Sequence, residues 1–359
     1  MSDVILAEVT RRWRSTGPTG VESVHRGSVV VADCSGKVVA VAGQDGELFL
    51  RSSAKPFQAL APVGCPPSGR GALDHFGFGS RELALFCASH SGEQMHVELG
   101  RSILERLELD DSDLDCGVHP PIEPAALASL YRSGGHVGPL HNNCSGKHLG
   151  MLTLARFRGW PIAGYVEREH PVQQEIFRIL GALLGRDAAS IPFATDGCGV
   201  PTARVSQREQ AQLFALLANP EGLPAEFRHA TERIAQAMAQ HPELVGGTGR
   251  MNTHLLEAAG DALVAKTGAE GSVGVGLRGR GLGISIKLAD GSSRALGPVL
   301  AALLTGLGLL SDEPGAEFRA RYLPVPVTNA RGERVGETRP AMRPINALLR
   351  KLRQAGLSQ

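Results

Sequence analysis

The amino-acid sequence predicts an α/β protein of the α+β kind, in which an antiparallel sheet domain flanked by helices is joined to a mostly helical domain. Strand-like segments lie near both ends of the chain, whereas its middle carries apolar residues at helical spacing. The length of 359 residues favours two structural units over one. We therefore predict a sheet-containing domain from residues 1–60 and 245–359, and a helical domain from residues 61–244. An active site is expected in the crevice between them.

The first elements are two β-branched strands, Val21–Ala32 and Val38–Ala42, separated by the turn residues Asp33–Gly36. Apolar residues at helical spacing then predict six helices, with proline and glycine in the gaps between them. These helices are Leu83–Cys87, Val97–Leu107, Pro124–Arg132, Val172–Leu184, Gln207–Leu217 and Ala225–Met238.

Strand signals return in the last third of the chain. Asp290-Gly291 is expected to form a hairpin turn after these strands. A helix from Arg294 to Leu309 should follow, and then a β ribbon over Val325–Val335 that turns around Asn329–Gly332. The predicted strands are Ala262–Lys266, Val273–Leu277 and Gly283–Leu288.

One motif in this region matches a dinucleotide-binding fingerprint by its letters alone. Gly274, Gly276 and Gly279 have the spacing of G-x-G-x-x-G. That fingerprint requires a helix after the glycines, so that the helix N-terminus can face a pyrophosphate. Here another strand follows, and we predict a hairpin.

Composition excludes several classes of protein. The net charge is +1 and there is no run of like charges, so no nucleic-acid partner is expected. Met1–Ile5 has no secretory pattern, and the most apolar stretch, Ala295–Leu310, is too short to cross a membrane. We expect a cytoplasmic protein. Its six cysteines occur singly, which favours reduced thiols or metal ligands over disulfides. They are Cys34, Cys65, Cys87, Cys116, Cys144 and Cys198.

The most informative chemical motif is Ser52-x-x-Lys55, combined with a distant Lys266-Thr267-Gly268. At the start of a helix, this spacing should place the Ser52 hydroxyl and the Lys55 amine one turn apart on one face. A lysine beside a second cation can lose its proton near neutral pH and act as the base for a serine. We expect Lys55 and Lys266 to lower each other's pKa. Taken singly, an N-cap serine with a solvated lysine, and a surface lysine at a strand end, remain alternatives.

Three further clusters combine residues that can carry chemistry. Cys87–Glu93 offers a hydroxyl, an imidazole and a carboxylate, or alternatively a turn that ends a helix. His141–His148 and Thr195–Pro201 each contain a cysteine in a glycine-containing turn. General metal-site spacing does not select these cysteines, for which buried thiols are the alternative.

Six blocks in order resemble the class 3 bacterial L-asparaginases, the thermolabile-type enzymes first associated with rhizobia. The resemblance runs from about Glu22 to the C-terminal region and covers nearly the whole chain. It implies a fold similar to serine β-lactamases and penicillin-binding proteins, and hydrolysis of L-asparagine to L-aspartate and ammonia. The blocks are Glu22–Gly27, Arg51–Pro56, Cys87–Glu93, His141–His148, Asp196–Pro201 and Lys266–Gly271.

The resemblance also implies site residues. The family's two Ser-Lys pairs fall on Ser52 with Lys55 and on Ser89 with Lys266. Asp196 matches the carboxylate that contacts substrate, and we add Arg51 and His90 from the neighbouring blocks as substrate-binding candidates. The family's zinc site falls on three residues, for which His141 and His148 are nearby rivals. They are Cys144, Lys147 and Cys198.

In this hypothesis Ser52 attacks the side-chain amide and Lys55 accepts its proton, while zinc positions substrate without generating the nucleophile. A homodimer is expected from the family. Two other functions are weighed: a β-lactamase or D,D-peptidase, for which the sequence lacks an export signal, and a non-catalytic protein stabilised by zinc. The preference for asparagine over glutamine is left open.

Overall fold

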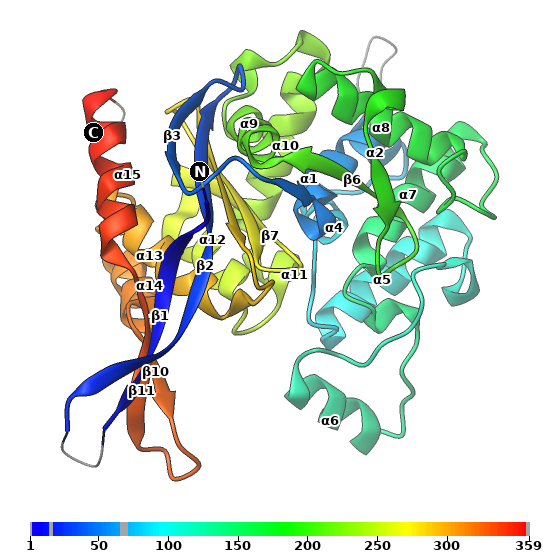
Figure 1. Ribbon diagram of the computed structural model, residues 1–359. Coiled ribbons are helices and arrows are strands. Elements are labelled where there is room, and N and C mark those ends of the chain that lie inside the picture. The colour runs from blue at the N-terminus through cyan, green and yellow to red at the C-terminus, as the bar shows by residue number, and fades with distance from the viewer. Residues whose placement is uncertain (1, 14–16, 65–70, 357–359) are drawn as a thin grey trace. The chain divides into compact units, whose positions relative to one another are not determined.

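The computed structural model of the chain describes residues 2–13, 17–64 and 71–356 (Figure 1). It contains two compact units. The sheet unit comprises Met1–Leu48, Ser206–Ala215 and Glu257–Gln359, and the helical unit comprises Phe49–Val205 and Leu216–Leu256. Residues 49–60, predicted in the sheet domain, belong to the helical unit, so the Ser52-x-x-Lys55 segment lies there as well.

The chain passes from one unit to the other inside secondary-structure elements. These are the strands β4 (Glu47–Phe49) and β6 (Pro201–Ser206) and the helices α9 (Gln207–Ala218) and α12 (Met251–Ala259). Such positions have no loop or linker composition in the sequence. The predicted boundaries at residues 60 and 245 therefore lie several residues from the boundaries in the structure.

The sheet unit is built on an eight-stranded sheet with the order β10-β11-β1-β2-β9-β8-β7, in which β3 also pairs with β2. Its pairings are antiparallel, and β1 joins β2 to β11, so both ends of the chain contribute to one sheet. The predicted α/β class with an antiparallel sheet is confirmed. The strands are β1 (Val4–Arg12), β2 (Thr19–Asp33), β3 (Val38–Ala42), β7 (Leu263–Gly268), β8 (Ser272–Leu277), β9 (Leu282–Leu288), β10 (Val325–Thr328) and β11 (Arg334–Pro340).

The glycine-rich segment of β8 and β9 forms a hairpin, as predicted. Its glycines have a packing role, because α9 crosses the sheet at this point. A Cβ on Gly274 would lie 2.1 Å from the Phe214 ring, and one on Gly283 would lie 1.9 Å from the carbonyl oxygen of Ala211. Close approach of a helix therefore explains the glycine at position 274, the first of the motif that resembles a nucleotide fingerprint, whereas Gly279 has a positive φ of +71°.

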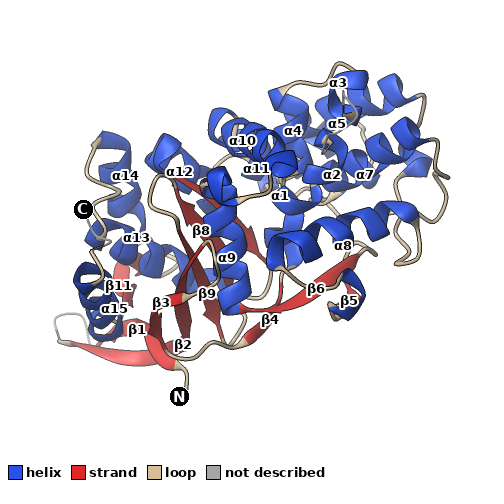
Figure 2. Cartoon of the chain, turned by 90° about the horizontal axis from the view of Figure 1, so that it is seen from above, coloured by secondary structure: helices blue, strands red, loops and turns tan. Residues whose placement is uncertain are grey.

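The expected hairpin turn at Asp290-Gly291 is wrong. The Asp290 carboxylate accepts a hydrogen bond from the amide of Ser292, and the chain then enters a 3-10 turn, Ser293–Ala295. The turn thus leads into a helix, since Ser292 supplies its N-terminal cap. The helices of this region are α13 (Leu296–Gly306), α14 (Glu313–Tyr322) and α15 (Met342–Gln354). Helix α15 packs on β1 and β3, and α13 packs on β11 (Figure 2).

The helical unit holds most of the chain's remaining helices, together with the antiparallel pair β5 (Phe193–Thr195) and β6 (Pro201–Ser206). Among the described residues, no helix combines the length and apolar character needed to cross a membrane. The helices are α1 (Lys55–Gln58), α2 (Leu60–Val63), α3 (Ala72–His75), α4 (Ser80–Phe86), α5 (Gln94–Leu107), α6 (Pro124–Arg132), α7 (Ser145–Arg158), α8 (Pro171–Leu184), α10 (Ala225–Gln240) and α11 (Pro242–Gly246).

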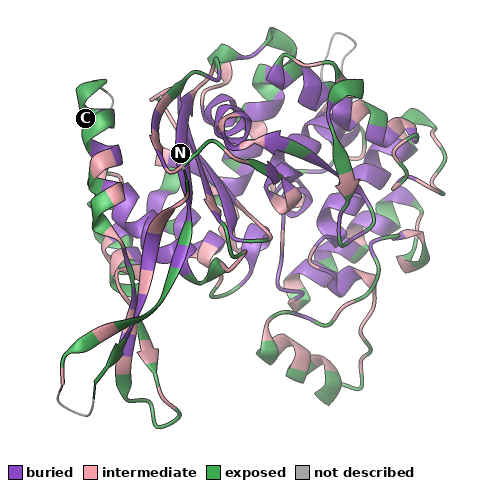
Figure 3. Cartoon of the chain, in the orientation of Figure 1, coloured by how far each residue is buried: buried purple, intermediate pink, exposed green. Residues whose placement is uncertain are grey.

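Helix α7 is the centre of this unit, since it packs on α2, α3, α4, α5 and α8. Every residue from Ser145 to Ala155 is buried, whereas α6 has no buried residue (Figure 3). A helix that is buried on all sides lacks the apolar periodicity that reveals a helix in the sequence. Gly146 permits close contact with α4, because a Cβ there would lie 2.0 Å from the carbonyl oxygen of Leu85.

Candidate active site

The Ser52-x-x-Lys55 segment begins where the chain leaves β4, which pairs with β6. The amide of Leu50 donates to the carbonyl oxygen of Ala203 at 2.9 Å. Arg51–Ala54 then form a 3-10 turn, and α1 starts at Lys55 with Pro56 in its first turn. Proline is accommodated there because amides of the first turn have no acceptor within the helix.

Arg51 is held in an unusual backbone conformation. Its φ is +48°, a left-handed value that costs a non-glycine residue about 1–2 kcal/mol. Its amide donates to Thr202 Oγ1 at 3.0 Å, and its Nε donates to Asp196 Oδ1 at 2.6 Å. These bonds fix both the backbone and the guanidinium of Arg51, a form of strain that is common at functional sites.

The Lys55 amine is fully buried and hydrogen-bonds to neutral oxygen atoms and to the thiol of Cys144. Its Nζ donates to the carbonyl oxygens of Ala88 at 2.5 Å and Asn143 at 3.3 Å, and to Ser89 Oγ at 3.0 Å. In the part of the chain that the structure describes, no carboxylate forms an ion pair with it. Burial lowers the pKa of Lys55 and the nearby charge of Lys147 lowers it further, although Cys144 and Cys198 act in the opposite direction.

The hydroxyl that Lys55 contacts is that of Ser89, not that of Ser52. Ser52 is half-buried, and within the described residues its hydroxyl makes no hydrogen bond. The lysine side chain turns into the protein interior to reach the carbonyl oxygens of Ala88 and Asn143, which removes it from the expected contact along the helix. The role of Ser52 as nucleophile stays a prediction.

The loop that carries Ser89 is fixed at its backbone and by His90. The amide of Ser89 donates to the carbonyl oxygen of Val245 at 2.9 Å. His90 is fully buried: its Nδ1 accepts from the amide of Gly92 at 3.1 Å, and its Nε2 lies 2.8 Å from Ser145 Oγ. Both ring nitrogens are occupied, so this arrangement does not support a substrate-binding role for His90. Its ring joins the Ser89 loop to α7.

The carboxylate of the Cys87–Glu93 cluster holds the other end of this loop. Glu93 accepts hydrogen bonds from Ser91 Oγ, and from the amide and hydroxyl of Thr248 at 2.8 and 2.7 Å. Burial alone would raise the pKa of Glu93, but these hydrogen bonds keep that pKa below its usual value. Gly247 allows the close approach, with φ of +106° and no room for a Cβ beside Ser91. The partners are 155 residues apart, and no local pattern indicates them.

Two asparagines before α7 are also part of the site. Asn142 Oδ1 accepts from the amide of Cys144 at 2.8 Å, and its Nδ2 donates to the carbonyl oxygen of Cys116 at 2.8 Å. The carbonyl oxygen of Asn143 accepts from Lys55 Nζ and from the amide of His90. In the sequence, the feature that could have indicated these contacts is the pair of asparagines before the buried helix α7.

Lys147, on α7, is the second buried lysine of the helical unit. Its Nζ lies 3.2 Å from Asp196 Oδ2, while the other oxygen of Asp196 accepts from Arg51 and from the amide of Gly197. Burial would raise the pKa of Asp196, but the charges of Lys147 and Arg51 hold it well below its usual value. Burial would likewise lower the pKa of Lys147, but Cys144, Cys198 and Asp196 raise it instead.

Cys144 and Cys198 are buried thiols that hydrogen-bond to each other. The bond from Cys198 lowers the pKa of Cys144 well below its ordinary value. Cys198 Sγ also lies 3.8 Å from Asp196 Oδ2, and Lys147 hydrogen-bonds to Cys198. Free thiols are found at the described cysteines, and Cys65 lies outside the described residues.

Two thiols and an amine in mutual contact form a donor set that fits zinc, provided that Lys147 releases its proton. Over residues 2–13, 17–64 and 71–356, no three His, Cys, Asp or Glu side chains gather as a metal site. His148 and His141 therefore do not join the two cysteines. His148 Nδ1 lies 2.7 Å from the Tyr165 hydroxyl, and His141 Nδ1 accepts from Gly138.

Lys266 belongs to the sheet unit. It lies on β7, is fully buried, and its Nζ donates to the carbonyl oxygen of Thr267 at 3.0 Å. Its pairing with Ser89 stays a prediction.

Comparison with protein-family models decides the family. Residues 13–340 match the model of L-asparaginase II. The chain belongs to the L-asparaginase II family. This confirms the resemblance found in the six sequence blocks, and membership in the L-asparaginase II family implies an amidohydrolase. No curated protein matches the chain.

Solved structures similar to this L-asparaginase II family chain are distant. A structure of Mglu is 15% identical in sequence, with a TM-score of 0.31. The match covers 92% of this chain and 67% of the Mglu chain. Mglu in its L-glutamate binding form is 16% identical with a TM-score of 0.35, covering 80% and 61%. A Bacillus glutaminase is 15% identical with a TM-score of 0.35, covering 79% and 91%. The chain thus spans about three-fifths to two-thirds of the length of the Mglu chains.

Proposed function

We propose that the protein hydrolyses L-asparagine to L-aspartate and ammonia through a covalent acyl-enzyme on a serine. The observation that carries the proposal is the buried Lys55 amine, which contacts the Ser89 hydroxyl at 3.0 Å and has no carboxylate partner among the described residues. A neutral amine in such a setting can take a proton from a hydroxyl. The fold proposed with this function is the serine β-lactamase-like arrangement, which the antiparallel sheet and the separate helical unit support.

In the proposed reaction, Ser52 Oγ attacks the side-chain carbonyl carbon of asparagine, and its proton passes to Lys55. Ser89, which contacts the amine directly, is suited to relay that proton. The tetrahedral intermediate then collapses as Lys55 returns the proton to the leaving nitrogen, and ammonia departs. Water, activated by the same amine, hydrolyses the aspartyl ester and regenerates Ser52. Lys266, in the sheet unit, is proposed to assist Ser89.

Substrate recognition is assigned to the Arg51–Asp196 pair. Asparagine carries an α-carboxylate and an α-ammonium group, which a guanidinium and a carboxylate bind with opposite charge. The two side chains are already joined at 2.6 Å, and Asp196 remains ionised at neutral pH because its pKa is lowered. A ligand that contacts the Arg51 guanidinium and the Asp196 carboxylate would bind to charged groups whose positions are already fixed.

Zinc is proposed at Cys144, Lys147 and Cys198. When bound, it would supply a fixed positive charge that holds these donors beside Asp196. The protein's own contribution there is to orient Asp196, through Lys147 and Cys198, toward the α-ammonium group. A cytoplasmic homodimer is the form in which we expect the enzyme to act.

The decisive experiment is ammonia release from asparagine and from glutamine, with mass spectrometry of the rapidly quenched protein. Wild type should release ammonia from asparagine and carry an aspartyl ester on Ser52. Ser53→Ala is the matched control, because the Ser53 hydroxyl donates to the carbonyl oxygen of Leu50 and should leave turnover within a few-fold. An aspartyl ester on Ser89 would instead make Ser89 the nucleophile, and Ser52 the serine that does not carry the acyl group. Hydrolysis of nitrocefin without ammonia release would favour the β-lactamase alternative.

A further inference from the structure

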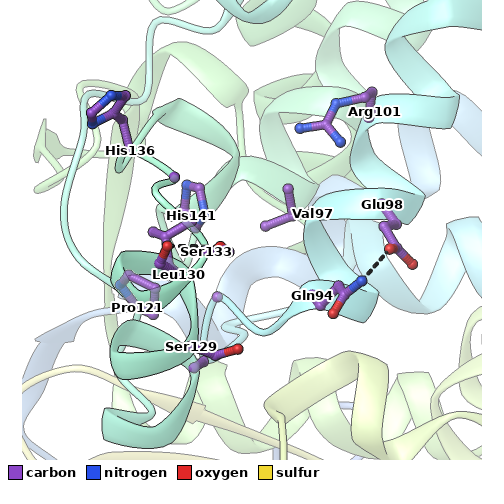
Figure 4. A pocket seen from close by; sticks show the side chains of 13 residues that line it. Gln94, Val97, Glu98, Arg101, Pro121, Ser129, Leu130, Ser133, His136 and His141 are labelled. Carbon is purple, nitrogen blue, oxygen red and sulfur yellow. Dashed lines mark hydrogen bonds between the residues drawn. The ribbon is translucent and has the colours of Figure 1, made fainter.

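The helical unit contains a pocket of about 480 Å³ that the proposed reaction does not use (Figure 4). It lies between α5, α6 and the 3-10 turn Pro139–His141. Ser52, Lys55 and Asp196 do not line it. Its volume is within the range of sites that bind small molecules.

An acid and a base face this pocket without neutralising each other. Glu98 and Arg101 lie three residues apart on α5, a spacing that permits an ion pair. Glu98 instead accepts a hydrogen bond from Gln94 Nε2 at 2.6 Å. In the part of the chain that the structure describes, Arg101 has no hydrogen bond or ion pair with another side chain. The pocket therefore offers one charge of each sign.

His141 adds a directed donor close to Arg101. Its Nδ1 lies 3.0 Å from the amide nitrogen and 3.3 Å from the carbonyl oxygen of Gly138, and in the tautomer that accepts from the amide the ring carries its hydrogen on Nε2. Burial, with the charge of Arg101 contributing, lowers the pKa of His141 and keeps the ring neutral at pH 7. Arg101 and His141 lie on either side of Val97 (Figure 4). A guanidinium and an imidazole N–H are together suited to bind a carboxylate.

The rest of the lining is small or apolar, apart from Gln94 and His136. Val97, Leu130, Pro121 and Ala126 supply apolar surface, and Ser129 adds a hydroxyl. We propose that this pocket binds a free α-amino acid as its zwitterion, with the carboxylate toward Arg101 and His141 and the ammonium group toward Glu98. It is a second amino-acid site in the same unit as the proposed active site.

The pocket is joined to the loop that carries Ser89. Gly92 lines the pocket, and its amide donates to His90 Nδ1. The carbonyl oxygen of Ser91 accepts from the amide of Ile122 at 2.8 Å, which fastens the segment before α6 to the same loop. An amino acid bound in the pocket would thus contact an element that also positions Ser89.

The test is calorimetric titration of the intact protein with L-aspartate, which the proposed reaction does not consume. We expect two binding events per chain. Arg101→Gln should abolish one of them or weaken it at least about tenfold, as expected for a lost charged hydrogen bond. Arg132→Gln is the matched control, since Arg132 lies on α6, is exposed and does not line the pocket. This control should keep both events.

Two further titrations are needed. One distinguishes the pocket from the proposed active site, and the other tests whether Glu98 binds the ammonium group of the ligand. Asp196→Asn should remove the event at the proposed active site and leave the one that depends on Arg101, so failure of the proposed reaction would not be mistaken for failure of this site. Glu98→Gln should weaken aspartate but leave succinate, which has no ammonium group, unchanged at the pocket. Identical isotherms for wild type, Arg101→Gln and Glu98→Gln would overturn the proposal, as would the absence of any aspartate binding in wild type.

Discussion

The surroundings of Lys55 and of Lys147 differ in one respect that decides their chemistry. Both lysines belong to the helical unit, and both are buried. Lys55 donates to two carbonyl oxygens and a hydroxyl, whereas Lys147 lies 3.2 Å from the carboxylate of Asp196. Burial lowers the pKa of Lys55, while the negative partners of Lys147 raise the pKa of that amine above its ordinary value.

Depth alone therefore does not set the protonation state of a buried lysine. Both amines interact with Cys144 and Cys198, and the carboxylate of Asp196 is the partner that Lys147 has in addition. The two environments are also linked, because the positive charge kept on Lys147 opposes a second positive charge on Lys55. The sequence suggested Lys266 as the cation that lowers the pKa of Lys55. Within the helical unit, Lys147 fills that role.

The largest expected effect is on turnover. Ser52→Ala should lower kcat for asparagine about 10⁴-fold or more, because it removes the attacking atom. Lys55→Met should lower kcat by at least about 10³-fold, as expected for loss of the base. Lys147→Met should act mainly through KM, since Lys147 only orients Asp196. Ammonia release at saturating and limiting asparagine measures all three, and a Lys55→Met enzyme with normal kcat would remove the distinction between the lysines.

The next effect is on stability and should differ in size between the two lysines. Lys147→Met leaves the buried carboxylate of Asp196 with Arg51 as its remaining cation, and we expect a loss of about 3 kcal/mol in the free energy of unfolding. Lys55→Met removes a buried amine that has no carboxylate partner among the described residues and leaves two carbonyl oxygens without this donor, and we expect a smaller loss, of about 1 kcal/mol. Urea denaturation at pH 7 measures both. Equal destabilisation by the two substitutions would contradict the comparison.

The sequence predicted some parts of this molecule well because their signals are local. The strand Val38–Ala42 and the helix Pro124–Arg132 have the predicted bounds, and the ribbon around Asn329–Gly332 is present. Helix α7 was not predicted, although it carries Lys147, because full burial removes the apolar periodicity.

Contacts in the site were harder to predict than its residues. The motifs bring Lys55, Ser89, Asp196 and the two cysteines together in one unit. The direction of the Lys55 side chain could not be read from Ser52-x-x-Lys55, because the carbonyl oxygens of Ala88 and Asn143 attract it from distant parts of the chain. The clamp between Glu93 and Thr248 likewise depends on tertiary contact.

A smaller effect should appear in the pH dependence of stability. The folded-state pKa of Lys55 is below that of the unfolded chain, about 10.4. Between these two values the unfolded state binds more protons, so the contribution of Lys55 rises with pH, by at most about 1.4 kcal/mol per unit. The free energy of unfolding of wild type should therefore increase relative to that of Lys55→Met from pH 7 to pH 10. A difference that stays constant across that range would show that Lys55 keeps an ordinary pKa.

The smallest effect concerns the metal beside Lys147. If zinc only positions substrate, a metal-stripped enzyme should show KM raised several-fold and kcat within about twofold of wild type. The double substitution Cys144→Ser with Cys198→Ser should behave in the same way and bind no zinc by elemental analysis. Cys34→Ser is the control, because Cys34 belongs to the sheet unit, whereas both thiols belong to the helical unit. Loss of turnover at saturating asparagine after metal removal would instead place zinc in the chemical step, and the division between a reactive Lys55 and a structural Lys147 would no longer hold.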